Sequence, residues 1–286
     1  VVMSRDRRDG KRVTNINGMS HIMYHLGKKR SENEVYINYD IDVTDLVKYV
    51  CDKNKNSDVH VTYFHVFVTA IGKVIYNRPL LNRFIVNGYF YDRRKVQVSY
   101  VAKTSFKDKS QELMKVLDIK EGDNLDTLSL KISKDVNKIR TSSSSGTDDL
   151  VTKIGNMPRF ARGMIVSVFK FLDKHDMLPS DMTKEILYYS SVIVSNLGSI
   201  DCKDAIYHHL SEMGTNSVII TIGKINEKQE IIKGNVETRS YCNFGVTLDE
   251  RIAYGLYFIK AIKLLEYILN NPILLEEDAN AKVEVK

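Results

Sequence analysis

A turn near the end of the chain, residues 249–255, carries residue types that could do chemistry. It reads Asp-Glu-Arg-Ile-Ala-Tyr-Gly, with acids beside a base and a glycine at its end. Before it, Val246 and Leu248 alternate with other residues as in a half-buried strand. After it, 256–271 has apolar residues at helical spacing and is followed by Pro272. A strand that delivers charged residues on a turn before a packed helix can hold a site rigidly.

Two adjacent histidines, His208 and His209, are a second candidate for chemistry. They lie between a stretch at 192–198, expected to be a strand that runs into a turn, and another strand expected at 217–223. Histidine is the side chain best suited to proton transfer near neutral pH. Because adjacent side chains point in different directions, at most one of them is expected to face a given pocket. The alternative is a surface or packed histidine pair that moves no proton.

We expect neither a metal site nor disulfide bonds. Cys51, Cys202 and Cys242 are an odd number at wide spacings without a Cys-x-x-Cys pair, which favours reduced thiols in a cytoplasmic protein. His21 and His25 lie one helical turn apart, but no third ligand can be named for them.

The elements that must position these residues follow from the hydrophobic pattern. Alternation predicts further strands at 35–41 and 96–102, and Asn87-Gly88 predicts a hairpin turn between 84–86 and 89–91. Helical spacing predicts helices at 19–26, 44–54, 62–78, 127–140 and 159–174.

These motifs and their order resemble those of the 2-oxoacid dehydrogenase acyltransferase catalytic domains and the chloramphenicol acetyltransferases, which share one fold. In that family the turn reads Asp-His-Arg-x-x-Asp-Gly, and this chain keeps Asp249, Arg251 and Gly255. Residues 79–82 match a Pro-x-Leu-Asn motif that precedes the hairpin. The resemblance covers two well-separated stretches, 35–103 and 186–275.

The resemblance implies an α/β (α+β) fold, the chloramphenicol acetyltransferase-like two-layer sandwich in which helices cover a mixed central sheet. We assign 35–275 to one such domain, with a basic N-terminal arm at 1–34 and a polar C-terminal tail at 276–286. The Ser-rich stretch 141–147 is expected to be a mobile loop. The sequence carries no lipoyl domain ahead of the core, so we expect any acyl carrier to be a separate molecule.

The resemblance also implies roles for site residues. The family carries Ile-Ser-Asn-Leu-Gly, whose Ser donates a hydrogen bond to the tetrahedral oxyanion, and Ser195 with Asn196 matches that motif. The alternative is that Ser195 and Asn196 bond only the local turn. Asp249 and Arg251 are expected to form a structural ion pair.

The chain departs from the family at two positions of the turn. Glu250 stands where the family has the His that takes a proton from the thiol of coenzyme A or a dihydrolipoyl group. Tyr254 stands where a second Asp helps to hold the turn. Glu250 can serve as a base only where desolvation raises its pKa, and His208 or His209 are the other candidate bases. These losses point away from the standard mechanism.

The chain is basic, with a formal charge of +6 and a pI near 9.0. This balance suits an anionic membrane surface, nucleic acid or a phosphate-rich ligand such as coenzyme A. Residues 5–12 and 28–30 hold the two basic clusters, which we interpret as solvated loops, and no nucleic-acid-binding motif accompanies them. No apolar run is long enough for a transmembrane helix, and the first residues lack the apolar region of a secretory signal.

The helix expected at 159–174 mixes large apolar residues with arginine and lysine. It could be a core helix, an oligomer contact or an interfacial membrane helix. We favour the first, because most amphipathic helices cover their own sheet.

Three functions therefore compete. The first is acyl transfer between coenzyme A and a thiol, hydroxyl or amine acceptor, with an altered base, by a homotrimer whose sites lie between subunits as the resemblance implies. The second is a catalytically inactive relative that acts as a trimeric binding or scaffold module. The third is a weak membrane-surface or nucleic-acid binder that uses the basic segments.

Overall fold

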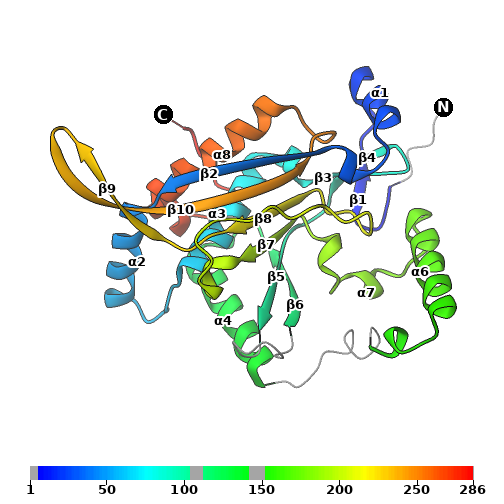
Figure 1. The fold of residues 1–286 in the computed structure, drawn as a ribbon, viewed down its shortest axis with the longest axis horizontal. Coiled ribbons are helices and arrows are strands. Elements are labelled where there is room, and N and C mark those ends of the chain that lie inside the picture. The colour runs from blue at the N-terminus through cyan, green and yellow to red at the C-terminus, as the bar shows by residue number, and fades with distance from the viewer. Residues whose placement is uncertain (1–5, 104–111, 142–151, 286) are drawn as a thin grey trace.

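A mixed seven-stranded sheet forms the centre of the computed structural model, which describes residues 6–103, 112–141 and 152–285 (Figure 1). Its strand order is β2 (Glu34–Asp42), β10 (Asn235–Asp249), β8 (Val218–Ile222), β7 (Val192–Asn196), β5 (Val96–Lys103) and β6 (Glu112–Ile119), and β9 (Asn226–Ile232) pairs with the outer part of β10. The β5–β7 and β7–β8 pairs are parallel and the others antiparallel.

A smaller three-stranded sheet is built around the predicted hairpin. β3 (Arg83–Val86) and β4 (Tyr89–Arg93) are joined by Asn87 and Gly88, both with positive φ, as a two-residue hairpin turn requires. β1 (Gly10–Arg12), from the stretch assigned to the arm, pairs with β4. The hairpin prediction is confirmed.

Helices cover one face of the central sheet (Figure 1). They are α2 (Thr44–Asn56), α3 (Tyr63–Asn77), α4 (Leu125–Thr141) and α8 (Gly255–Asn270). Thr62 caps α3 by accepting a hydrogen bond from the backbone of His65. Pro79 starts the short 3-10 helix η2 (Pro79–Asn82) and ends the α-helical run. The structure is therefore the predicted two-layer α/β domain.

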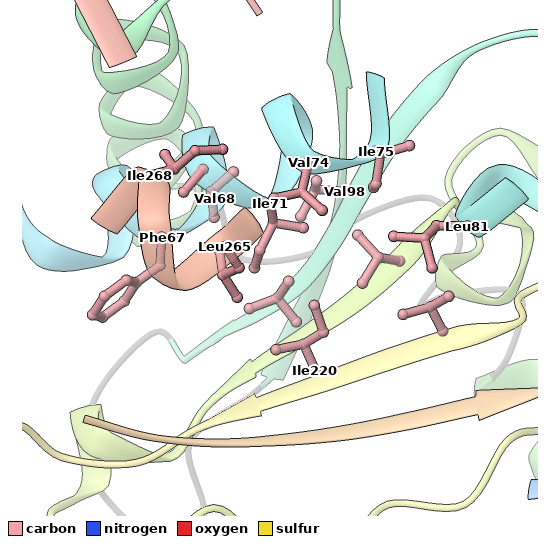
Figure 2. Close-up of a cluster of buried hydrophobic side chains, with 14 of the residues drawn as sticks. Phe67, Val68, Ile71, Val74, Ile75, Leu81, Val98, Ile220, Leu265 and Ile268 are labelled. Carbon is pink, nitrogen blue, oxygen red and sulfur yellow. The ribbon is translucent and has the colours of Figure 1, made fainter. Parts of the chain in front are cut away.

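The core lies between α3, α8 and the sheet (Figure 2). From His65 to Ile75 every residue of α3 is buried, which explains why its sequence is apolar on all sides. Next to it lies a cavity of about 40 Å³ with an apolar lining that includes Ile71, Val192 and Leu265. A cavity with such a lining stays dry and offers a polar ligand no partner.

The helix α6 (Arg159–Lys174) does not cover the sheet, so the favoured interpretation of this segment as a core helix is wrong. Among its residues only Asp173 is buried, and Phe160 is 82% exposed. Figure 1 shows α6 at the edge of the molecule, beside the short helix α7 (Ser180–Thr183). The helix is amphipathic as predicted, but several of its large apolar residues are exposed and do not pack on the sheet.

The basic clusters are only partly solvated, which corrects the interpretation of both as solvated loops. Arg7 is 4% exposed and donates hydrogen bonds to the carbonyl and the carboxylate of Asp173. Arg30 is 5% exposed and lies in η1 (Arg30–Glu32). Both side chains hold distant parts of the chain together.

Two further expectations concern the Ser-rich stretch and transmembrane helices. The Ser-rich stretch 141–147 lies outside the described residues, apart from Thr141 at the end of α4. Within the described ranges, none of the helices has the length and apolar character needed to cross a membrane.

The buried histidine of α3 predicts a pH-dependent stability. Burial, followed by the charge of His60, lowers the pKa of His65 from 6.5 to about 4. Below pH 6.5 the unfolded chain binds a proton that the native chain excludes, so stability is expected to fall as the pH drops towards 4. The loss should reach about 3 kcal/mol. Urea unfolding across this pH range measures it.

The imidazole Nδ1 of His65 accepts a hydrogen bond from the backbone N–H of Thr62 at 3.3 Å. His65→Gln keeps an acceptor there without a titrating group, so it should remove most of the pH dependence. His208→Gln, at an exposed histidine, is the matched control and should leave the dependence unchanged. An equal dependence in the His65 variant and the parent would contradict the assignment.

Candidate active site

The turn after β10 is held by a buried ion pair. Asp249 is fully buried and Arg251 is 6% exposed. The guanidinium Nε donates to Oδ1 of Asp249 at 2.8 Å, and Nη2 donates to Oδ2 at 2.7 Å. This two-bond geometry is the strongest that arginine makes with a carboxylate. The structural ion pair expected from the resemblance is present.

Arg251 also binds the segment before β2. Its Nη1 donates to the carbonyls of Gly27 and Lys28 at 2.9 and 3.0 Å. Asn33 donates to the carbonyl of Gly27 as well, at 3.0 Å. Burial alone would lower the pKa of Arg251, but the hydrogen bonds and charge of Asp249 raise it above its ordinary value. The side chain therefore stays charged.

Arg30 forms a second buried contact at this end of the sheet. It donates to the carbonyl of Ser211 at 2.8 Å and to that of Gly214 at 2.7 Å. Burial lowers its pKa, although the charge of Asp249 opposes the effect. Arg30 thus ties the segment 201–217 to the Asp249 end of the sheet, a role that sequence reasoning missed because its partners are backbone carbonyls.

Glu250 is exposed in the single chain. Its backbone N–H donates to the carbonyl of Asn33 at 2.9 Å, so the position of the residue is fixed while its carboxylate faces solvent. The dry surroundings that would raise the pKa of a carboxylate are not supplied by this chain alone.

Tyr254 and Gly255 lead into α8. The Tyr254 side chain is 60% exposed, and its hydroxyl lies 3.4 Å from that of Ser20 in α1 (Gly18–Leu26). It makes no side-chain cap for α8. An added Cβ at Gly255 would meet no atom within 4 Å, so packing within the chain does not require glycine there.

Ser195 lies at the carboxyl end of β7 and faces away from the helices. Val194 belongs to the core beneath them, whereas Ile193 packs with Leu210 of segment 201–217 on the opposite face. Ser195 shares the face of Ile193 because side chains alternate along a strand. Within the described part of the chain its hydroxyl forms no hydrogen bond, so it remains available as a donor.

The turn after Ser195 has its own contacts. The carbonyl of Asn196 accepts a hydrogen bond from Ser199 at 2.7 Å, in the 3-10 helix η4 (Leu197–Ile200). A Cβ on Gly198 would lie 2.8 Å from the carbonyl oxygen of Gly223, so only glycine allows this approach. The local turn is thus held by Asn196 and Ser199 without the Ser195 hydroxyl.

The register of the sheet separates Ser195 from Glu250. Ser195 pairs with Thr221, and Thr221 pairs with Gly245 of β10. Glu250 comes five residues after Gly245, so strand rise and spacing place it roughly 20 Å from Ser195. One chain therefore does not bring the predicted oxyanion donor and the predicted base together.

His208 and His209 lie at the Glu250 end. The Tyr207 hydroxyl and the Leu210 N–H, on either side of the pair, both donate to the carboxylate of Glu34. Glu34 is the first residue of β2 and pairs with Asp249 in the sheet. Both histidines are exposed, and Nδ1 of His208 lies 3.3 Å from the carbonyl of Ile206. Three candidate bases thus share one end of the sheet.

A groove of about 510 Å³ lies elsewhere, between the end of α3, η2 and the strands β4 to β6, and none of the predicted site residues lines it. Several of its charged side chains already pair, as in Lys95 with Asp118 and Arg94 with Asp6. Among the described residues, no three metal-ligating side chains gather in one place.

Neither protein-family models nor curated protein sequences match this chain. Solved structures do. A probable dihydrolipoamide acetyltransferase from Listeria monocytogenes has 16% identity and a TM-score of 0.58, with 92% of this chain and 95% of that chain covered. The dihydrolipoamide acetyltransferase of Azotobacter vinelandii, investigated for a serine, a histidine and an asparagine in its mechanism, has 11% identity, a TM-score of 0.59 and coverage of 93% and 94%.

A chloramphenicol acetyltransferase is similar in the same way, with 12% identity, a TM-score of 0.56 and coverage of 91% of this chain and 99% of that chain. The resemblance inferred from the motifs is thus confirmed as a likeness of fold. The chain has the chloramphenicol acetyltransferase-like fold.

The buried ion pair predicts a large effect from a small substitution. Asp249→Asn keeps the shape of the side chain but leaves the charge of Arg251 buried without a counter-charge. We expect a loss of about 3–5 kcal/mol in the free energy of unfolding, measured by urea denaturation. Asp45→Asn breaks the exposed pair with Lys48 and should cost no more than about 1 kcal/mol. Similar losses in the two variants would refute the structural role of the pair.

Proposed function

We propose that this protein transfers acyl groups between coenzyme A and a thiol, hydroxyl or amine acceptor, at sites formed between neighbouring copies in a homotrimer. The observation that carries the proposal is the Ser195 hydroxyl, which the acetyltransferase-like fold presents at the end of β7 without a hydrogen-bond partner among the described residues. The basic character of the chain suits the phosphates of coenzyme A.

The proposed reaction begins when a base takes the proton of the acceptor. The acceptor atom then attacks the carbonyl carbon of the acyl thioester and forms a tetrahedral oxyanion. Ser195 donates a hydrogen bond to this oxygen, where negative charge develops. As the intermediate collapses, the carbon–sulfur bond breaks and the departing thiolate of coenzyme A recovers the proton from the base.

The separation of Ser195 from Glu250 along the sheet supports sites between subunits. In a ring of identical chains, the base end of one copy can face the Ser195 end of the next. The neighbour would also cover Glu250, remove water from it and raise its pKa towards the range of a working base. His208 or His209 would be the base if Glu250 stays solvated.

A second candidate is a trimeric binding or scaffold module without turnover. It is favoured by the turn, where Glu250 replaces the histidine of the resembled motif and the exposed Tyr254 leaves α8 without a side-chain cap. In this case the ion pair of Asp249 and Arg251 would persist as a structural element alone.

Calorimetric titration with coenzyme A and acetyl-coenzyme A separates the candidates. The acyltransferase should bind with a stoichiometry of about one per chain, since a ring of three chains has three interfaces and one site at each. Absence of heat and of thermal stabilisation at millimolar ligand would favour the scaffold module.

A mixing experiment tests whether two chains build each site. Ser195→Ala should reduce acyl transfer about 100-fold or more, because the oxyanion loses its donor, and Glu250→Gln should do so if Glu250 is the base. Equal mixing of the two variants should restore about a quarter of the activity, since one site in four combines an unmutated Ser195 of one chain with an unmutated Glu250 of its neighbour.

Subunit exchange is verified by native mass spectrometry. Exchange without recovered activity would place the site within one chain and contradict the arrangement. If Glu250→Gln alone stays active, the same mixing is repeated with His208→Ala and His209→Ala.

A further inference from the structure

The helix α6 presents a continuous apolar side to solvent. Phe160, Met164, Val168 and Phe171 follow one another at helical spacing, so they share a face. They are 82%, 53%, 52% and 58% exposed. Contiguous exposed apolar surface of this kind usually marks an interaction site.

The exposed charges of α6 and of the described residues directly before it are all positive. From Thr152 to Lys174 the exposed charged residues are Lys153, Arg159, Arg162, Lys170 and Lys174. The acids at the end of the helix, Asp173 and Asp176, are paired with Arg8 at 2.5 and 2.7 Å. An apolar face bordered by cations is the pattern of helices that lie in the surface of an anionic membrane.

Contacts at its carboxyl end fix the helix against the domain. Nη1 of Arg7 donates to the carbonyl of Asp173 at 2.9 Å, and Asn87 donates to that of Lys174 at 2.8 Å. The Arg8 contacts to both acids add to this anchor. The helix is therefore anchored at its carboxyl end, at the edge of the molecule in Figure 1, and the four apolar residues of its face stay exposed.

We propose that α6 docks on anionic lipid surfaces, with Phe160 and Phe171 buried among the acyl chains and the basic residues at the headgroups. The charge complementarity favours this occupant. A second copy of this chain also has a net charge of +6, so its charge balance gives no acidic surface to match the cations of α6. Nucleic acid would pair with the cations but leave the two phenylalanines in water.

Vesicle flotation tests the proposal. The full chain should float with vesicles of about 30% phosphatidylserine in phosphatidylcholine, remain unbound with pure phosphatidylcholine, and dissociate at about 0.5 M salt. The chain contains no tryptophan, so Phe160→Trp introduces a single tryptophan, whose emission can be excited apart from that of the tyrosines. Its emission should shift to the blue on binding, whereas Tyr63→Trp, at an exposed position on α3, should not shift.

Two sets of variants, each with a matched control, separate apolar from electrostatic binding. Phe160→Ser with Phe171→Ser should abolish flotation, while Ile231→Ser with Val236→Ser, equally exposed on β9 and β10, should not. Binding should weaken about tenfold or more when glutamine replaces the four basic residues of α6, Arg159, Arg162, Lys170 and Lys174. It should not weaken when glutamine replaces four exposed lysines elsewhere, Lys48, Lys55, Lys260 and Lys263.

Several results would overturn the proposal. The first is failure of the parent chain to float with anionic vesicles. Equal effects of the α6 variants and their controls would also refute it, as would preferred binding to an oligonucleotide. The fourth concerns the double variant Phe160→Ser with Phe171→Ser. In analytical ultracentrifugation it would separate an oligomer into single chains, while its flotation with vesicles would be unchanged. That outcome would assign the face to a second copy.

Discussion

The ion pair of Asp249 and Arg251 is the interaction on which the rest of this end of the molecule depends. Both groups are removed from water, and a buried charge is tolerated only when its partners compensate for the lost solvation. Asp249 satisfies two guanidinium nitrogens, and the third binds the carbonyls of Gly27 and Lys28. The end of β10 is thereby fastened to the segment that enters β2.

This constraint extends to the candidate site through neighbouring buried groups. Arg30 lies in the segment that Arg251 holds, and it holds the segment 201–217 in turn. That segment carries His208 and His209, and its Leu210 N–H donates to the carboxylate of Glu34, the first residue of β2. Hydrogen bonds to backbone carbonyls thus fix the segments that carry the candidate bases, while the side chains of Glu250, His208 and His209 stay exposed.

Two parts of the molecule obey different rules. The sheet and the helices α3 and α8 form a densely packed core, where position follows from the need to bury apolar surface (Figure 2). The helix α6 keeps its large apolar residues exposed and is anchored by Arg7 and Arg8 at one end. The polar contacts at its carboxyl end position the helix, while its apolar residues remain exposed to solvent.

The local elements follow from the amino-acid pattern alone. Alternation located β2 and β5, helical spacing located α3 and α8, and Asn87-Gly88 located the hairpin, because each pattern reflects contacts close in sequence. The motifs at 249–255 and 79–82 indicated the fold, and the resemblance implied the ion pair of Asp249 and Arg251, whose burial only the structure shows.

Which residues meet across the fold could not be predicted from that pattern. Arg30 reads as one more basic residue because its partners are backbone carbonyls, which leave no mark in the sequence. An amphipathic helix has the same pattern whether it covers a sheet or faces solvent, so the exposure of α6 was also undecided. The distance between Ser195 and Glu250 depends on strand order and register, which arise from pairings between residues far apart in the chain.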